Sequence, residues 1–232
     1  EVGQWEAARQ TADAIADPRE RAKALRDLAQ AQARAQQWTE AWQTADAIAD
    51  PFQRAAALRA LAQALAEAGD DAAARPTFAA ARQTAEAIAD PRERAEALRA
   101  LAQALAAAGQ WADARRSAEA IADPEKRAEA LGALAQALAA AGQWTDARQS
   151  AEAIADPEKR AEALRDLAQA LINAGQIDDA MALLVGAWAR AQTVDELTEL
   201  FVVDSSLLRT YPTLGGDLLA AFGWVERVVR AG

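Results

Sequence analysis

Apolar residues recur along this chain at intervals of three and four, the spacing that places them on one face of an α-helix. The clearest stretch runs from Pro157 to Ala174. Its leucines are Leu164, Leu167 and Leu171, and the alanines beside them are Ala161, Ala163, Ala168 and Ala170. Because alanine is small, this face lets a neighbouring helix approach closely. The pattern predicts an amphipathic helix over residues 157–174.

A second helical stripe precedes the first. Trp144, Ala147, Ala151 and Ile154 fall on one face of a helix that ends shortly before Pro157. Connections of only a few residues join helices that lie side by side and run antiparallel. The sequence therefore predicts pairs of antiparallel helices.

These helix pairs repeat along the chain. Residues 109–141 and 142–174 differ at only six positions. An Ala-Asp-Pro phrase recurs, and its successive prolines are 33 residues apart except for one interval of 40. They are Pro18, Pro51, Pro91, Pro124 and Pro157. A fixed period of this size is typical of a solenoid, in which each unit buries its apolar face against its neighbours.

Each first helix carries signals for its start and its end. Aspartate before proline suits the N-cap, because its carboxylate accepts from the free amides of the first turn and proline needs no partner at the first helical position. A single glycine marks the C-terminus. Three units also offer a reciprocal capping box, through Glu20, Gln53 or Glu93. The other two have Lys126 or Lys159 at that place, so Asp-Pro alone must cap those helices.

Two places depart from the regular pattern. The first full unit has Gln36 where later units have glycine, so we expect a less well formed turn there. The second full unit carries seven extra residues after Gly69, and Phe78 takes the place of tryptophan. Seven residues are close to two helical turns, so they would lengthen the second helix without rotating its face. Pro76 is expected to bend that helix, and we interpret the insertion as an outer bulge rather than a functional element.

The repeats predict how the chain is divided. Residues 1–192 form the array, with a half repeat over 3–17 and full repeats that start near Pro18, Pro51, Pro91, Pro124 and Pro157. Residues 193–232 leave the period and are predicted to form a C-terminal helical cap on the last repeat. The half repeat leaves an edge that a preceding unit would cover, which favours a piece of a longer protein. Alternatively, that helix is itself an N-terminal cap.

Composition excludes several kinds of site. The chain contains neither cysteine nor histidine, which excludes disulfides, thiol or imidazole catalysis and Cys/His metal sites. A net charge of −10 opposes non-specific binding to nucleic acid or to an anionic membrane. We find no apolar run long enough to span a bilayer, no glycine-rich phosphate loop and no catalytic constellation. We therefore expect a soluble, cytoplasmic protein that is not an enzyme and uses no cofactor or metal.

Starting at Ala128, the unit has the sequence A-E-A-L-G-A-L-A-Q-A-L-A-A-A-G-Q-W-T-D-A. This order of large, small and glycine positions resembles the tetratricopeptide repeat. The matching residues are Leu131, Leu134, Ala135, Leu138, Gly142, Trp144, Ala147 and Pro157. Two features differ from the family: the unit is one residue shorter, and Ala151 stands where a large residue is usual. The resemblance implies an all-α fold, a right-handed α-solenoid of antiparallel helix pairs in 33-residue repeats with a C-terminal helical cap.

The resemblance also implies a binding groove, because in that family the first helices line the concave face. The fifth-place residues here are Arg26, Arg59, Arg99, Gly132 and Arg165, and the ninth-place residues are Gln30, Gln63, Gln103, Gln136 and Gln169. Glutamine both donates and accepts hydrogen bonds, and arginine can grip a carboxylate through two donors. Apart from Gly132, these are the predicted groove residues, and they suit an extended, partly acidic peptide. Near-identical repeats would also copy such residues without a function.

Ala-rich units of this kind are also similar to the repeats that follow the nucleotide-binding module of bacterial signal-transducing NTPases of the STAND type, where they act as sensor arms. The resemblance implies a non-enzymatic module that binds a protein or peptide, as the sensor or scaffold part of a larger bacterial protein. The alternative is a structural spacer, or an array that self-associates through its open N-terminal edge. Neither nucleic acid nor a membrane is expected as a partner.

Overall fold

The computed structural model describes residues 2–191 and Leu200 of the 232-residue chain. It contains two compact units, the first ending at Arg127 and the second beginning at Ala128. The elements of the described residues are α1 to α11, all of them α-helices, and no β-strand occurs in this part of the chain. The predicted all-α class is therefore confirmed.

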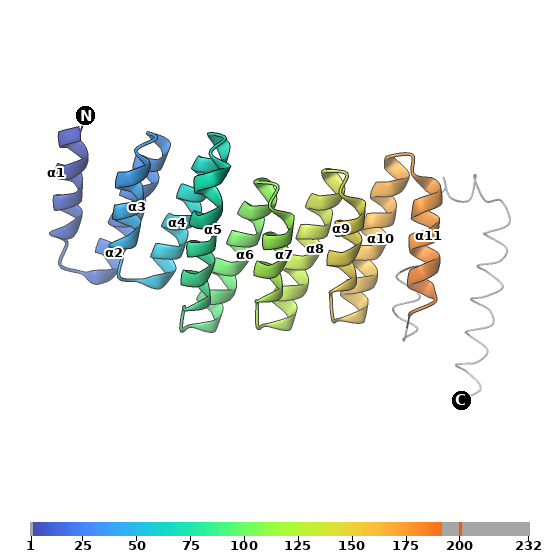
Figure 1. Ribbon diagram of the computed structural model, residues 1–232. Helices are drawn as coiled ribbons and strands as arrows, with labels where there is room; N and C mark the ends of the chain where they lie inside the picture. Colours follow the sequence, from blue (N-terminus) through green and yellow to red (C-terminus); the bar gives the residue numbers. More distant parts are fainter. Residues whose placement is uncertain (1, 192–199, 201–232) are drawn as a thin grey trace. The chain divides into compact units, whose positions relative to one another are not determined.

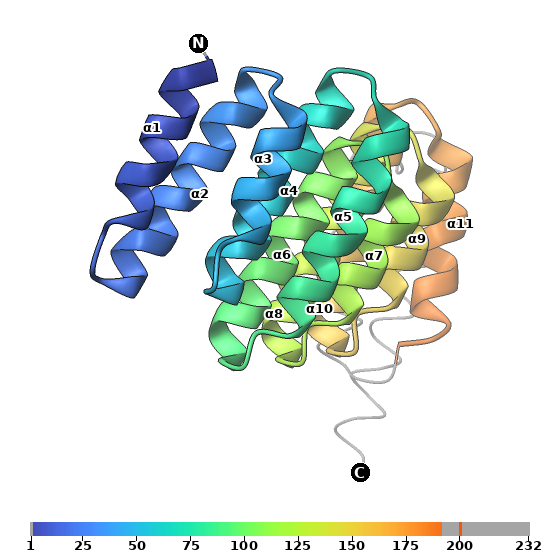
Figure 2. The ribbon, with the colours of Figure 1, turned by 60° about the vertical axis from the view of Figure 1, so that its left-hand side comes forward.

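Helix pairs build the first unit (Figure 1). A single helix, α1 (Val2–Asp13), precedes them. The pairs are α2 (Pro18–Arg34) with α3 (Trp38–Asp46), α4 (Pro51–Glu67) with α5 (Asp71–Glu86), and α6 (Pro91–Ala107) with α7 (Trp111–Glu119). The two helices of a pair pack against each other, and α4 also packs against α2 and α6. First helices thus form one layer and second helices the other, as in an α-solenoid (Figure 2).

The second unit follows the same pattern. Its helices are α8 (Pro124–Ala140), within which the boundary between the units falls, α9 (Trp144–Glu152), α10 (Pro157–Asn173) and α11 (Ile177–Trp188). Helix α10 packs against both α9 and α11. All five first helices of the described residues begin at the prolines of the Ala-Asp-Pro phrase, so the helices follow the period of the sequence.

The predicted aspartate caps are present on all five first helices. In each, an aspartate oxygen accepts from the backbone N–H three residues later, at 2.8 or 2.9 Å. The reciprocal half of the capping box is replaced in two units. The Glu20 carboxylate accepts from Lys23 Nζ at 2.8 Å, and Gln53 Oε1 accepts from Arg26 Nη1 at 2.7 Å. Nearby cations therefore compete with the backbone for these two acceptors.

The first helices end in a left-handed residue. Gly69, Gly109, Gly142 and Gly175 have φ between 69° and 81°. The prediction of a poorer turn at Gln36 is wrong, because this residue adopts φ 58°. The next N–H then donates to the Gln32 carbonyl at 2.9 Å, as the equivalent N–H does in the glycine-containing units. The hydrogen bonds of the turn thus hold a non-glycine residue in a conformation that glycine adopts at lower cost.

Leucine and alanine side chains fill the space between the helices. The buried residues of α10 are Ala161, Leu164, Leu167, Ala168 and Leu171. Ala163 and Ala170, predicted to widen this stripe, are only partly buried, because they lie at its edges. Trp38, Trp111 and Trp144 open the short second helices and are likewise partly buried.

Helix α5 contains the seven-residue insertion. It has 16 residues, whereas α7 has 9. Phe78 is buried at the position where other repeats have tryptophan. Ala74 and Thr77 extend the same buried face toward the N-terminus of the helix. The insertion therefore lengthens the helix without rotating its face, as predicted. Pro76 lies inside this helix, and the bend expected there stays a prediction.

The predicted C-terminal cap over 193–232 lies outside the described residues except for Leu200. Leu200 is buried, and its carbonyl accepts from Trp188 Nε1 at 3.2 Å. The division of the chain at residue 192 stays a prediction.

Candidate functional site

The predicted groove residues all lie on first helices, and none of them is buried. Arg99, Gln103 and Gln136 are exposed, and the other six are partly exposed. Their equal places in successive repeats put them on the same side of each helix. This face is therefore open to a ligand, whereas the Leu/Ala face of the same helices is not.

A hollow lies between α2 and α4 in the first unit. Its volume is about 310 Å³. Three predicted groove residues line it, Gln30 from α2 and Arg59 and Gln63 from α4, together with Arg34 and Glu67. Two arginines against one carboxylate give this hollow a positive charge. It therefore favours an anionic group.

Arg59 is the most unusual cation of this hollow. It is partly buried, and burial lowers the pKa of its guanidinium from the ordinary value. Its Nη1 donates to Gln63 Oε1 at 2.8 Å, and no ion pair joins it to a carboxylate within the described residues. A partly desolvated cation whose partner is a neutral amide would gain from a carboxylate supplied by a ligand.

Arg26 has a different environment although it occupies the equivalent place. Its Nη2 lies 2.7 Å from Asp27 Oδ1, and its Nη1 donates to Gln53 Oε1 on the next first helix at 2.7 Å. This guanidinium is thus already engaged. The sequence pattern treats Arg26 and Arg59 alike, but the structure makes Arg59 the better anion-binding residue.

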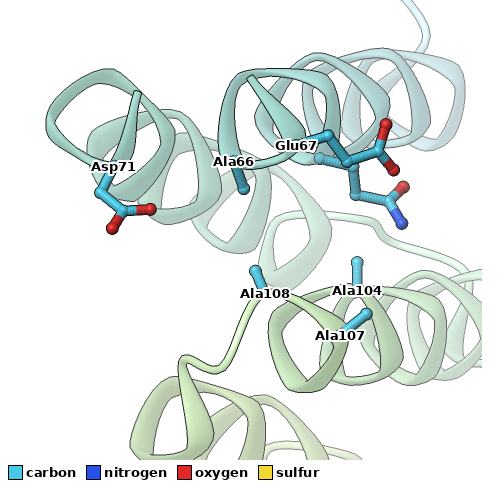
Figure 3. Close-up of a pocket in the computed structure, with 7 residues that line it drawn as sticks. Ala66, Glu67, Asp71, Ala104, Ala107 and Ala108 are labelled. Atoms are coloured by element: carbon cyan, nitrogen blue, oxygen red, sulfur yellow. The ribbon is translucent and has the colours of Figure 1, made fainter. Parts of the chain in front are cut away.

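A second hollow of about 220 Å³ lies between α4 and α6 (Figure 3). It shares Gln63 and Glu67 with the first one. Ala104, Ala107 and Ala108 form its α6 side. The two hollows therefore adjoin across α4, so the face of the first unit can receive consecutive side chains of one extended ligand.

The second unit has its own hollow between α8 and α10, of about 290 Å³. Gly132 and Gln136 line it from α8, and Asp166 lines it from α10. Gln136 Nε2 donates to Asp166 Oδ2 at 3.2 Å, and Arg165 Nη2 lies 3.5 Å from Asp166 Oδ1. Gln169 Nε2 donates to Asn173 Oδ1 at 3.2 Å. Gln136 and Arg165 are thus linked through Asp166, whereas Gln169 contacts Asn173 on its own helix.

Ion pairs recur on the second helices. Arg82, Arg115 and Arg148 occupy one place of successive second helices, and each lies within 3.7 Å of a glutamate four residues later. Trp42 takes this place in α3 and is 39% exposed. Exposed ion pairs of this kind contribute little to the stability of the fold. Because these charges are already paired with each other, the second helices are a poorer binding surface for a charged ligand than the first helices are.

The sequence pattern missed several residues of the site. The hollows of the first unit are also lined by Arg34, Glu67 and Asp71. The repeats do not all carry the same residue at these positions. Residues that recur could be found by comparing repeats, whereas these three needed the structure.

Among the described residues, no group of three or more acidic, cysteine or histidine side chains is arranged to hold a metal ion. In this part of the chain no helix has the length and apolar character needed to cross a bilayer.

Comparison with known proteins supports the resemblance of the repeats. Residues 138–199 match the family model described as tetratricopeptide repeat. No curated protein matches the chain. These repeats are therefore similar to tetratricopeptide repeats, as their sequence predicted.

Two solved structures match the chain in a structural comparison. One is the crystal structure of a Podosopora anserina protein described as a kinesin light chain with nearly identical TPR-like repeats; it is 22% identical over 73% of this chain and 93% of its own, with a TM-score of 0.40. The other is Ton1535 from Thermococcus onnurineus NA1, 15% identical over 86% of this chain and 84% of its own, with a TM-score of 0.32.

Proposed function

We propose that this chain is a non-enzymatic module that binds a protein through an extended, partly acidic peptide, and that the first-helix face is the binding surface. Residues Arg26, Gln30, Arg59, Gln63, Arg99, Gln103, Gln136, Arg165 and Gln169 form this surface in the proposal. The observation that supports it best is Arg59, a partly buried cation at the wall of an open hollow that has no carboxylate partner among the described residues.

The arrangement of hollows favours an extended ligand. Two of them adjoin across α4 and share Gln63 and Glu67. A peptide lying across α2, α4 and α6 would place successive side chains in these hollows, while the glutamines hydrogen-bond to its backbone as donor and acceptor. An acidic side chain next to Arg59 would form a charge-assisted pair.

The test is a peptide-display selection on the full chain, followed by affinity measurement with the recovered peptides. We expect the selection to enrich aspartate and glutamate. Arg59→Ala with Gln63→Ala should weaken binding by at least about tenfold, because a lost charge-assisted hydrogen bond is worth roughly 1.5–3 kcal/mol. Arg99→Ala with Gln103→Ala should weaken binding without loss of helicity.

A matched control uses the same residue types on second helices. Arg116→Ala with Gln83→Ala removes one exposed arginine and one exposed glutamine from α7 and α5. This pair should leave affinity unchanged. Recovery of peptides without acidic residues, or equal losses in the groove and control variants, would refute the proposed surface.

We further propose that the module serves as a sensor or scaffold part of a larger bacterial signalling protein in the cytoplasm. The support is the similarity of its Ala-rich units to the arrays of signal-transducing NTPases. If so, a recovered ligand should raise the melting temperature in proportion to occupancy.

The rival proposal is a spacer or self-assembling array. A self-assembling array differs from a binding module in a simple measurement, because its molecular mass would rise with concentration in the absence of any ligand. Sedimentation of the chain over a wide concentration range measures this mass. A constant mass would contradict self-assembly, and a mass that rises with concentration would support it.

A further inference from the structure

One repeat lacks the arginine that the other four full repeats carry. Gly132 stands at the fifth place of α8, where the others have Arg26, Arg59, Arg99 and Arg165. A Cβ added at Gly132 would meet nothing within 4 Å. The missing side chain therefore leaves open space, and this space is part of the hollow of about 290 Å³ between α8 and α10.

Another repeat shows how an arginine side chain lies at this place. Arg26, the residue equivalent to Gly132, reaches Asp27 on its own helix and Gln53 on the next first helix. The residues equivalent to these two partners are Ala133 and Lys159. Both line the hollow beside Gly132, so the hollow lies where an arginine side chain lies in the other repeat.

The charges around this hollow suit a cation. Its carboxylates are Glu129 from α8 and Glu162 and Asp166 from α10, and its cation is Lys159. Asp166 already contacts Arg165 at 3.5 Å and Gln136 at 3.2 Å. No ion pair joins Glu129 or Glu162 to a cation within the described residues. Three carboxylates against Lys159 and the adjoining Arg165 still leave the hollow negative.

We propose that the hollow at Gly132 binds an arginine side chain of the peptide ligand, whose guanidinium replaces the one that Gly132 lacks. The guanidinium donates hydrogen bonds to the carboxylates of Glu162 and Asp166, and the aliphatic part of the arginine side chain lies against Ala133 and Ala163. This inference rests on the proposed function, because it assigns one residue of the same peptide. The second unit would then select a basic residue, while Arg59 in the first unit selects an acidic one.

The test uses N-acetyl-arginine amide as probe and the full chain as receptor, followed by amide chemical shifts in NMR. We expect saturable shifts at Gly132, Gln136 and Asp166 with millimolar affinity. N-acetyl-citrulline amide has nearly the same shape without the charge, and it should bind at least about tenfold more weakly.

Two variants of one residue separate a filled pocket from an altered fold. Gly132→Arg should abolish the shifts, because the chain's own guanidinium then occupies the hollow. Gly132→Ala should keep them, and it should raise the melting temperature by about 2–4 °C, because alanine is a better residue than glycine inside a helix. In both variants the added Cβ meets no atom within 4 Å.

Three outcomes would overturn the inference: no saturable shift in the parent chain, equal binding of the arginine and citrulline probes, or unchanged binding in Gly132→Arg. Its failure can be distinguished from failure of the proposed function. If acidic peptides bind in an Arg59-dependent manner and the arginine probe does not bind, the pocket alone is wrong. If the arginine probe binds and no peptide is recovered by display, the pocket stands and the peptide-binding function is wrong.

Discussion

Two repeats of the first unit, α2–α3 and α6–α7, differ in how well their sequence suits the same fold. In the α6–α7 repeat, Leu105 is 1% exposed and Gly109 makes the left-handed turn. The α2–α3 repeat has Gln32 and Gln36 at these places. Gln32 is 2% exposed, and its Oε1 has no hydrogen-bond partner among the described residues.

The contrast extends to a buried hydroxyl. Ser117 in α7 donates to the Asp113 carbonyl at 2.9 Å. Its equivalent in α3, Thr44, is fully buried, and its hydroxyl has no partner within the described part of the chain. Both repeats nevertheless have the same helix lengths and the same N-cap. The Asp-Pro cap and the remaining apolar stripe therefore suffice to specify the helix pair, and the departures reduce stability without changing the fold.

The largest change in stability should come from giving the α6–α7 repeat a residue of the less stable α2–α3 repeat. Leu105→Gln removes a buried apolar side chain and introduces a buried amide, so we expect a loss of about 3 kcal/mol in the free energy of unfolding. Urea unfolding of the variant measures it. A change below about 1 kcal/mol would show that glutamine is tolerated at this position of the repeat. The difference between Leu105 and Gln32 would then not explain any difference in stability between the two repeats.

The reverse change should stabilise the weaker repeat. Gln32→Leu replaces a buried, incompletely paired amide with the residue found in the other four units, and we expect a gain of about 1–2 kcal/mol. The comparison of urea midpoints at constant slope tests it. A loss of stability would mean that Gln32 has a favourable role that its surroundings in this structure do not explain.

The turn residues should give a smaller effect of opposite sign in the two repeats. Gln36→Gly should stabilise by about 1 kcal/mol, because glycine adopts φ 58° without strain. Gly109→Ala should lower the free energy of unfolding by about 1 kcal/mol, because alanine is strained in the left-handed conformation. A clash does not add to this cost, because a Cβ at this position meets no other atom within 4 Å. Thermal unfolding of the two single variants checks both values. Equal signs for the two changes would contradict the explanation through backbone strain.

The smallest effect concerns the N-cap of the weaker repeat. The hydrogen bond from the Glu20 backbone N–H holds the pKa of Asp17 below its ordinary value of 3.8. The stabilisation by this carboxylate is therefore present above the ordinary pKa and is lost as the pH falls through the lower, folded-state pKa. Asp17→Asn keeps a capping acceptor without the charge. Acid unfolding curves should show a shallower loss of stability for this variant than for the parent.

The periodic part of the molecule was predictable from the sequence, because leucine spacing, Asp-Pro and glycine each act locally. The well formed turn at Gln36 was not, because its cost is offset by hydrogen bonds that only the folded turn supplies. The places of the groove residues on open helix faces followed from the repeat. Their individual partners did not: Arg26 pairs with Asp27 and also donates to Gln53 on the next first helix, whereas Arg59 contacts Gln63 on its own helix. The contact with Gln53 depends on the packing of neighbouring helices. The hollow at Gly132 likewise depends on side chains from the next first helix.

The most direct test of the central claim is to locate a bound peptide on the first unit. A peptide recovered by display, carrying one photoreactive benzophenone side chain, would be cross-linked to the full chain, and the cross-linked residues identified by mass spectrometry. The account predicts cross-links on α2, α4 and α6 that disappear with Arg59→Ala and Gln63→Ala. Cross-links concentrated on α3, α5 and α7 would contradict it, because they would place the ligand on the second helices.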